Sequence, residues 1–224
     1  MKLLALETAT QWCSVALLEA GGTPLARSEL APRAQTDLVL PMVQALLNES
    51  GWALSDLDGI AFAHGPGAFT GVRVATSVAQ GLAFSAGLPV VGVSTLASCA
   101  MSASQEHGPG QWLAAFDARM NQLYVGGYQV TEEGRVSVLI DDALCDPDSL
   151  PELPAGSWRG AGDGANVIAD SAKGIVDEWF ADVAPQAATV AQLAMPRLLA
   201  GDTLAPERAA PVYLRNQVIQ GAIK

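Results

Sequence analysis

Two acidic side chains occupy matching places in the sequence, each directly after an apolar stretch that is predicted to be a strand. Glu7 ends the first such stretch, and Asp117 ends another in the second half of the chain. Carboxylates at two strand ends can hold Mg²⁺ together with phosphate oxygens, or activate a nucleophile. The turns that follow contain bulky Trp12 and Met120 instead of glycine. This favours a second interpretation, in which both acids accept backbone hydrogen bonds within turns.

Two glycine-rich loops are candidate anion sites. A strand, a glycine turn and a helix N-terminus form one at residues 59–71, and small residues at 160–164 could form a nest of N–H donors. No Gly-Lys-Ser/Thr follows the second loop, so it is not a P-loop. The alternative is that the glycines only permit sharp turns and close packing. The candidate anion-binding residues are Thr8, Gly65, Gly67, Thr70, Gly162, Asp163 and Gly164.

Residue patterns of a metal-dependent or nucleophilic hydrolase are missing from the sequence. His64 and His107 are the only histidines, and their spacing fits no HExxH motif. The segment 92–96 reads Gly-Val-Ser-Thr-Leu, which is not GxSxG. We therefore expect no metal, no cofactor and no catalytic residue, and a peptidase is the least favoured function.

Composition limits the partners of this chain. Its 224 residues carry a net charge of −11 without any basic run, so we expect RNA contact only through a partner protein. Half of the residues are apolar, which is enough for a sizeable core. The three cysteines are scattered, the N-terminus lacks a signal-peptide pattern, and no apolar run could span a membrane. These features predict a cytoplasmic protein.

The elements that position the two acids repeat along the chain. Leu3 to Leu18 aligns with Leu113 to Tyr128, and in each half a meander of three short strands precedes a glycine loop and a helix. Such self-similarity indicates a duplicated domain. We expect an N-terminal lobe at 1–105, completed by the segment 200–224, and a C-terminal lobe at 106–199. The predicted helices include 36–50, 70–86 with Thr70 as N-cap and Gly87 as stop, 95–105, 166–180 and 189–199.

The first predicted helix has more apolar residues than one buried face requires. One face must cover the sheet of its own lobe, and the other could meet a second helix or a partner protein. The competing explanation is that all of these side chains are internal core. The predicted interface residues are Leu38, Met42, Ala45 and Leu46 on this helix, with Arg73, Thr76, Gln80 and Phe84 on the next.

Several longer motifs together resemble the TsaB (YeaZ) family over essentially the whole chain. They are LALETAT at 4–10, HGPGAFTGVR at 64–73 and PVYLR at 211–215, with Leu40-Pro41 and Gly81-Leu82-Ala83 between them. The resemblance implies an α/β, duplicated two-lobed actin/sugar-kinase/Hsp70-like fold. Two positions depart from the family's usual pattern, because Glu7 replaces Asp and Gln35-Thr36 replaces a His-Ser pair. Both departures fit a scaffold better than an enzyme.

The same resemblance implies a function in making N6-threonylcarbamoyladenosine beside the anticodon of tRNA. Members of the family are non-catalytic partners of TsaD, which they bind through the helices of the N-terminal lobe, and the ATPase TsaE joins the pair. In isolation they form homodimers through the same helices, and tRNA is reached only through the complex. The alternative function is an ATP-binding kinase-like enzyme of the same fold, suggested by Glu7, Asp117 and the loop at 160–164.

Overall fold

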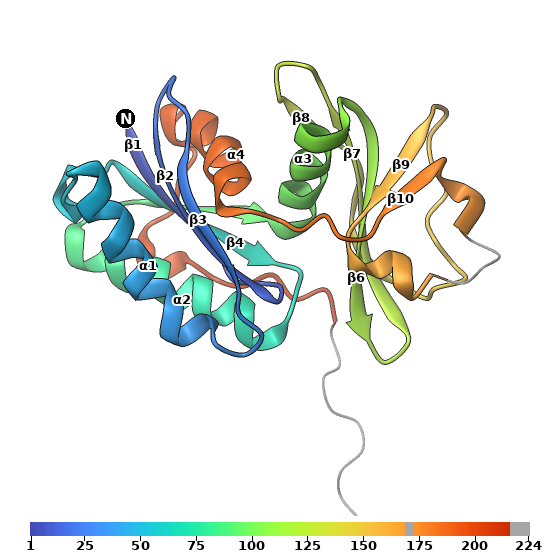
Figure 1. Ribbon diagram of the computed structural model, residues 1–224, viewed down its shortest axis with the longest axis horizontal. Helices are drawn as coiled ribbons and strands as arrows, with labels where there is room; N and C mark the ends of the chain where they lie inside the picture. Colours follow the sequence, from blue (N-terminus) through green and yellow to red (C-terminus); the bar gives the residue numbers. More distant parts are fainter. Residues whose placement is uncertain (169–172, 216–224) are drawn as a thin grey trace, which may run out of the picture.

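The first part of the chain folds into a mixed five-stranded sheet (Figure 1). In the computed structural model, which describes residues 1–168 and 173–215, the sheet order is β3-β2-β1-β4-β5. The first three strands form an antiparallel meander, and β4 and β5 continue the sheet parallel to β1. Their bounds are β1 Lys2–Glu7, β2 Trp12–Glu19, β3 Leu25–Leu30, β4 Gly59–Gly65 and β5 Val90–Ser94.

A second sheet repeats this arrangement in the order β10-β9-β6-β7-β8. Again three strands form an antiparallel meander, and the remaining two run parallel to the first of them. The bounds are β6 Gly110–Arg119, β7 Gln122–Val130, β8 Val136–Cys145, β9 Trp158–Ala161 and β10 Glu178–Phe180. The shared order confirms the duplicated fold predicted from the sequence.

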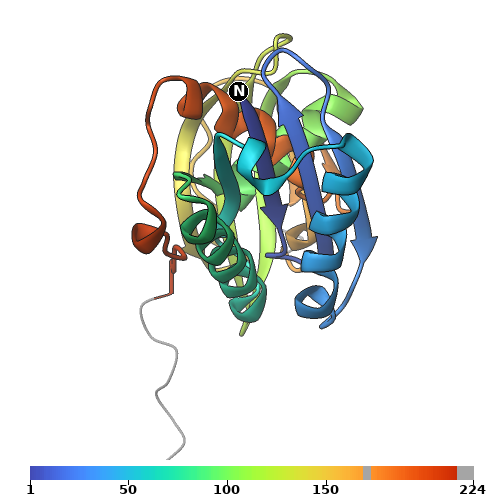
Figure 2. The ribbon, with the colours of Figure 1, turned by 90° about the vertical axis from the view of Figure 1, so that its left-hand side faces the viewer.

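Two long helices cover the outer face of the first sheet. Helices α1 (Gln35–Ser50) and α2 (Phe69–Ala86) lie side by side there, with η1 (Leu54–Asp56) in the connection between α1 and β4 (Figure 2). Gly51 and Gly87 end the two helices in the left-handed conformation, as predicted for glycine at this position. The predicted N-cap was wrong: α2 begins after Ala68 without a side-chain cap, and Thr70 lies in its first turn.

The predicted helix at 166–180 was also wrong. The chain there forms short 3-10 turns, η2 (Asp163–Asn166) and η3 (Lys173–Ile175), followed by β10, while residues 169–172 lie outside the described part. Strand β10 pairs in parallel with β9, Glu178 lying opposite Arg159. Pairing with a neighbouring strand thus outweighs local helix propensity in this segment.

Two further helices lie between the sheets and cross the lobe boundary expected from the sequence (Figure 1). Helix α3 (Thr95–His107) follows the first sheet in sequence, but its buried side chains pack with Trp112 and Tyr128 of the second. Helix α4 (Ala187–Leu199) follows the second sheet but packs on the first, with Val190 and Leu198 against its inner face. Each of these two helices therefore packs on the other sheet, not on the sheet that it follows in the chain.

The segment after α4 returns along the first lobe. Leu204 exchanges two backbone hydrogen bonds with Val90 at the edge of the sheet, both 2.9 Å long. After the short turn η4 (Pro206–Arg208), Ala209 enters the core beneath α1 and α2. No helix in the described ranges 1–168 and 173–215 has the length and apolar character required to cross a membrane.

Candidate functional site

A cleft of about 770 Å³ lies between the two lobes. Its walls come from the turn after β1, the N-terminal end of α2, the β6–β7 turn and the segment that follows η4. Of the residues predicted to bind an anion, the cleft brings together Gly67, Thr70 and Asp163. Asp117 also lines it, whereas Glu7 does not.

Glu7 is buried completely at the end of β1. One carboxyl oxygen accepts the Ala9 N–H at 2.6 Å, and the other has no hydrogen-bond partner among the described residues. Loss of hydration raises the pKa of Glu7 from 4.5 to about 8, and the Ala9 N–H opposes this shift. The acid is therefore mostly protonated at neutral pH, a state that does not suit a magnesium ligand.

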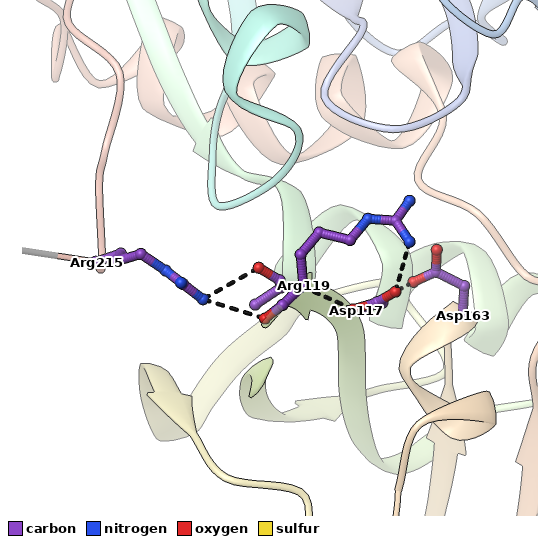
Figure 3. Close-up of polar contacts among 5 residues, drawn as sticks. Asp117, Arg119, Asp163 and Arg215 are labelled. Carbon is purple, nitrogen blue, oxygen red and sulfur yellow. Dashed lines mark hydrogen bonds and ion pairs between the residues drawn. The ribbon is translucent and has the colours of Figure 1, made fainter. Parts of the chain in front are cut away.

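Asp117 belongs to a small network at the floor of the cleft (Figure 3). Its carboxylate accepts the Arg119 N–H at 2.7 Å and pairs with the Arg119 guanidinium at 2.8 Å. The Asp117 N–H in turn reaches the Asp163 carboxylate at 3.1 Å. Asp163 stays exposed at the cleft margin, yet the surrounding chain removes part of its hydration and raises its pKa. Asp117 is thus engaged in turn and ion-pair contacts, which is the second interpretation given for it above.

Close packing accounts for the glycines on the first side of the cleft. A Cβ on Gly67 would lie 2.5 Å from the Ala9 carbonyl oxygen, and one on Gly71 would lie 2.0 Å from that of Thr8. The Ala68 N–H donates to Ala9, and the Thr8 hydroxyl donates to the Gly71 carbonyl. The N-terminal end of α2 is therefore joined directly to the turn after Glu7.

The glycines of the second loop are equally crowded. A Cβ on Gly160 would meet the Trp179 ring, and one on Gly162 or Gly164 would meet Ala115. Gly162 also has a φ of +100°, which side chains rarely allow. Within residues 1–168 and 173–215, no three His, Cys, Asp or Glu side chains gather as a metal site would require. Anion binding by either loop remains a prediction.

The residues predicted to meet a partner occupy three different depths. Leu46 has no exposed area, and Met42 and Thr76 are also buried. Leu38, Ala45 and Gln80 are half-buried, whereas Arg73 and Phe84 are exposed. Leu46 packs into the core under α1 and α2, so its apolar spacing signals the interior and not the outer face.

Sequence reasoning gave no interface role to Gly81, which lies exposed in the middle of α2. Apart from its own helix backbone and chain neighbours, no atom of residues 1–168 and 173–215 comes within 4 Å of the position that its Cβ would occupy. Glycine in a helix interior costs about 1 kcal/mol relative to alanine, and nothing inside the lobe requires it here. The sequence feature that could have indicated an interface role for this residue is a glycine in the middle of a long predicted helix. Val74, Val78 and Leu82 of the same helix are half-buried and pack against the core of the first lobe.

The two sheets of equal strand order, the helices between them and the interlobe cleft define the class: this is the duplicated two-lobed actin/sugar-kinase/Hsp70-like fold. An activator of 2-hydroxyisocaproyl-CoA dehydratase from Clostridium difficile shares this fold at a TM-score of 0.51 and 10% identity, with 90% of this chain and 97% of that chain covered.

Closer relatives identify the family within this fold class. Residues 27–205 match the model of the TsaD family, described as tRNA N6-adenosine threonylcarbamoyltransferase. The tRNA threonylcarbamoyladenosine biosynthesis protein TsaB of Escherichia coli K12 is 41% identical over 97% of this chain and 96% of its own length. The structure of YeaZ from Pseudomonas aeruginosa superposes with a TM-score of 0.87 and 40% identity, covering 95% of this chain and 99% of that one. The chain belongs to the TsaB (YeaZ) family.

Proposed function

We propose that this chain is a non-catalytic subunit of the machinery that forms N6-threonylcarbamoyladenosine on tRNA. In this proposal it binds TsaD through the outer side of α1 and α2, and TsaE joins the pair. Two free copies associate through the same helices, and tRNA is held by the complex as a whole. The biosynthetic assignment is supported by near full-length similarity to proteins named for it.

The observation that carries the scaffold assignment is the outer side of α2. Gly81 leaves an open place on the helix surface, bordered by half-buried Val74 and Val78, and Phe84 is 76% exposed one turn further on. Small residues permit the close approach of another helix, and an exposed aromatic side chain is typical of an interface anchor. The buried, largely protonated Glu7 and the ion-paired Asp117 support a subunit without its own reaction.

The test is binding of purified TsaD to the full chain, followed by calorimetry and size-exclusion chromatography. Gly81→Arg adds a long charged side chain on the outer side of α2 without touching the fold, so we expect at least about tenfold weaker binding. Ser137→Arg, on exposed strand β8 of the other lobe, adds the same charge and should bind normally. Unchanged binding of Gly81→Arg would place the interface elsewhere. Leu46→Glu is unsuitable, because it would disrupt the core.

A further inference from the structure

The C-terminal strap, defined here as residues 204–215, begins on the first lobe. Leu204 pairs with Val90 at the edge of the first sheet. Further along, the Val212 N–H donates to the His64 carbonyl at the end of β4, with a distance of 2.7 Å. These backbone hydrogen bonds fix the strap to two strands of the first lobe (Figure 1).

The last described residue of the strap reaches the second lobe. Arg215 donates to the carbonyl oxygens of Ala118 and Arg119 at 3.1 and 3.3 Å (Figure 3). It also contacts the Met120 sulfur. These groups belong to the β6–β7 turn. Arg215 therefore forms a non-covalent connection between the lobes, separate from the chain crossings at α3 and α4.

The turn that Arg215 contacts is conformationally strained. Arg119, Met120 and Asn121 have φ values of 61°, 56° and 57°, a left-handed run that is unfavourable for residues with a Cβ. Such a run persists only when surrounding contacts hold it, and strain of this kind is common at sites that switch conformation. Arg215 supplies two of those contacts, to the carbonyls of Ala118 and Arg119, which both line the cleft.

The strap also contacts the N-terminal end of α2. Arg73 donates through Nε to the Tyr213 hydroxyl at 2.7 Å, and its guanidinium lies 3.5 Å from the centre of the Phe69 ring. The Phe69 and Tyr213 rings are themselves 5.9 Å apart. A continuous path of contacts thus runs from exposed Arg73 through Tyr213 to Arg215 and the turn in the opposite lobe.

We propose that the strap holds the two lobes at a fixed separation and couples occupancy of the outer side of α2 to the conformation of the β6–β7 turn. The holding role rests on the contacts of the free chain alone. The coupling role rests on the proposed function, because it requires a partner at α2. A partner that draws Arg73 away from Tyr213 changes the position of the strap and releases or tightens its hold on the turn.

The holding role is tested on the isolated full chain with Arg215→Gln, which removes the cationic donor. Hydrogen exchange at residues 118–123 should become about tenfold faster or more, because these amides lose the contacts that keep the turn in place. Spin labels at Gln44→Cys and Ser137→Cys, one in each lobe, should show a broader distance distribution. Arg208→Gln is the matched control, since Arg208 is exposed in the same segment and its side chain has no partner among the described residues. Unchanged exchange and distances in Arg215→Gln, or equal changes in Arg208→Gln, would overturn the holding role.

Coupling is tested by adding TsaD and measuring exchange at 118–123 again. We expect saturating TsaD to change exchange in the unsubstituted chain by severalfold and to have no such effect in Tyr213→Phe, which keeps the ring but loses the acceptor for Arg73. An equal response in both chains, or no response in either while calorimetry shows binding, would overturn the coupling. Absence of binding by calorimetry would instead contradict the proposed function and leave the result on the isolated chain standing.

Discussion

At the scale of single residues, Glu7 and His64 give the first lobe opposing responses to pH. Burial raises the pKa of Glu7 to about 8, so the folded state keeps a proton that the unfolded chain loses above its ordinary pKa of 4.5. Burial, followed by the positive charge of Arg197, lowers the pKa of His64 from 6.5 to about 4. Glu7 therefore lowers stability as pH rises from 4.5 to 8, whereas His64 raises it from 4 to 6.5.

These two effects partly cancel below pH 6.5, and above that pH only the effect of Glu7 remains. We expect the free energy of unfolding to fall by about 1.5 kcal/mol between pH 6.5 and 8, because the unfolded state gains from ionisation while the folded carboxyl stays largely protonated. Urea unfolding at a series of pH values measures this slope.

The control is Glu7→Gln, which keeps an oxygen for the Ala9 N–H and removes the titration. Its stability should be nearly constant from pH 6.5 to 8 and should exceed that of the unsubstituted chain at pH 8. A slope that persists in Glu7→Gln would assign the pH dependence to another group. Removing His64 by His64→Gln should extend the falling slope down to about pH 4.5, since the opposing titration is then lost.

The position of Glu7 was predictable from the sequence, but its protonation was not. An apolar run that ends in an acid is visible in the letters at 2–7. The solvent exposure of the carboxyl depends on α2, because Gly71 of that helix packs directly against Thr8. The two residues are more than sixty positions apart in the sequence. Asp117 has the same local pattern, yet it lines the cleft, where it forms an ion pair with Arg119.

At the scale of elements, two glycines of α2 have opposite roles. Gly71 faces inward, where a Cβ would lie 2.0 Å from the Thr8 carbonyl oxygen, while Gly81 faces open space. We expect Gly71→Ala to destabilise the protein by about 1–3 kcal/mol, because backbone must move to admit the methyl group. At protein concentrations low enough to dissociate the proposed homodimer, Gly81→Ala should stabilise the chain by about 0.5–1 kcal/mol through helix propensity.

Urea midpoints of the two variants at one pH test this pair directly, and each serves as the control for the other. Stabilisation by Gly71→Ala would mean that the contact between α2 and the turn after β1 is looser than the geometry indicates. Destabilisation by Gly81→Ala would mean that its side of α2 is covered in the free chain, as it would be in a homodimer. Repeating the measurement at several protein concentrations distinguishes that case.

Sequence patterns predicted the elements that are determined locally. The meander at 2–30 and the helices that end at Gly51 and Gly87 have short-range signals, namely turn glycines and apolar runs. The error at 166–180 arose where a three-residue strand depends on a partner far away in sequence. The predicted interface residue Leu46 was misplaced for a related reason, because apolar spacing does not state which of two apolar sides faces the sheet.

At the scale of the whole molecule, the exchange of α3 and α4 between the sheets was beyond the reach of sequence patterns. Helix α3 is buried along most of its length, and α4 is apolar with small residues, so either could cover either sheet. Long-range hydroxyl contacts accompany the observed arrangement: Ser98 of α3 and Thr189 of α4 lie 2.7 Å apart, and the Ala187 N–H at the start of α4 donates to Ser14 of the first sheet. Neither of these long-range contacts can be predicted from the residues that neighbour it in the sequence.

This exchange predicts how the chain can be divided. A fragment of residues 1–105 follows the boundary expected from the sequence, but it lacks α4 and leaves Leu3, Ala61 and Val91 uncovered on the inner face of the first sheet. Each fully buried aliphatic side chain contributes about 1.5–3 kcal/mol to folding stability. Exposing several residues of this layer therefore costs more free energy than the about 5–15 kcal/mol that usually stabilises a domain. We expect the fragment to aggregate or to lack a cooperative thermal transition.

A fusion of residues 1–94 with 183–215 through a flexible Gly/Ser linker should behave differently. It restores α4, the pairing of Leu204 with Val90 and the placement of Ala209 beneath α1 and α2, while omitting α3, which belongs to the other sheet. Cooperative melting followed by circular dichroism, with dispersed amide signals in NMR, is the expected result. A folded fragment 1–105 beside an unfolded fusion would contradict the assignment of α4 to the first lobe, because only the fusion carries the helix that covers that sheet.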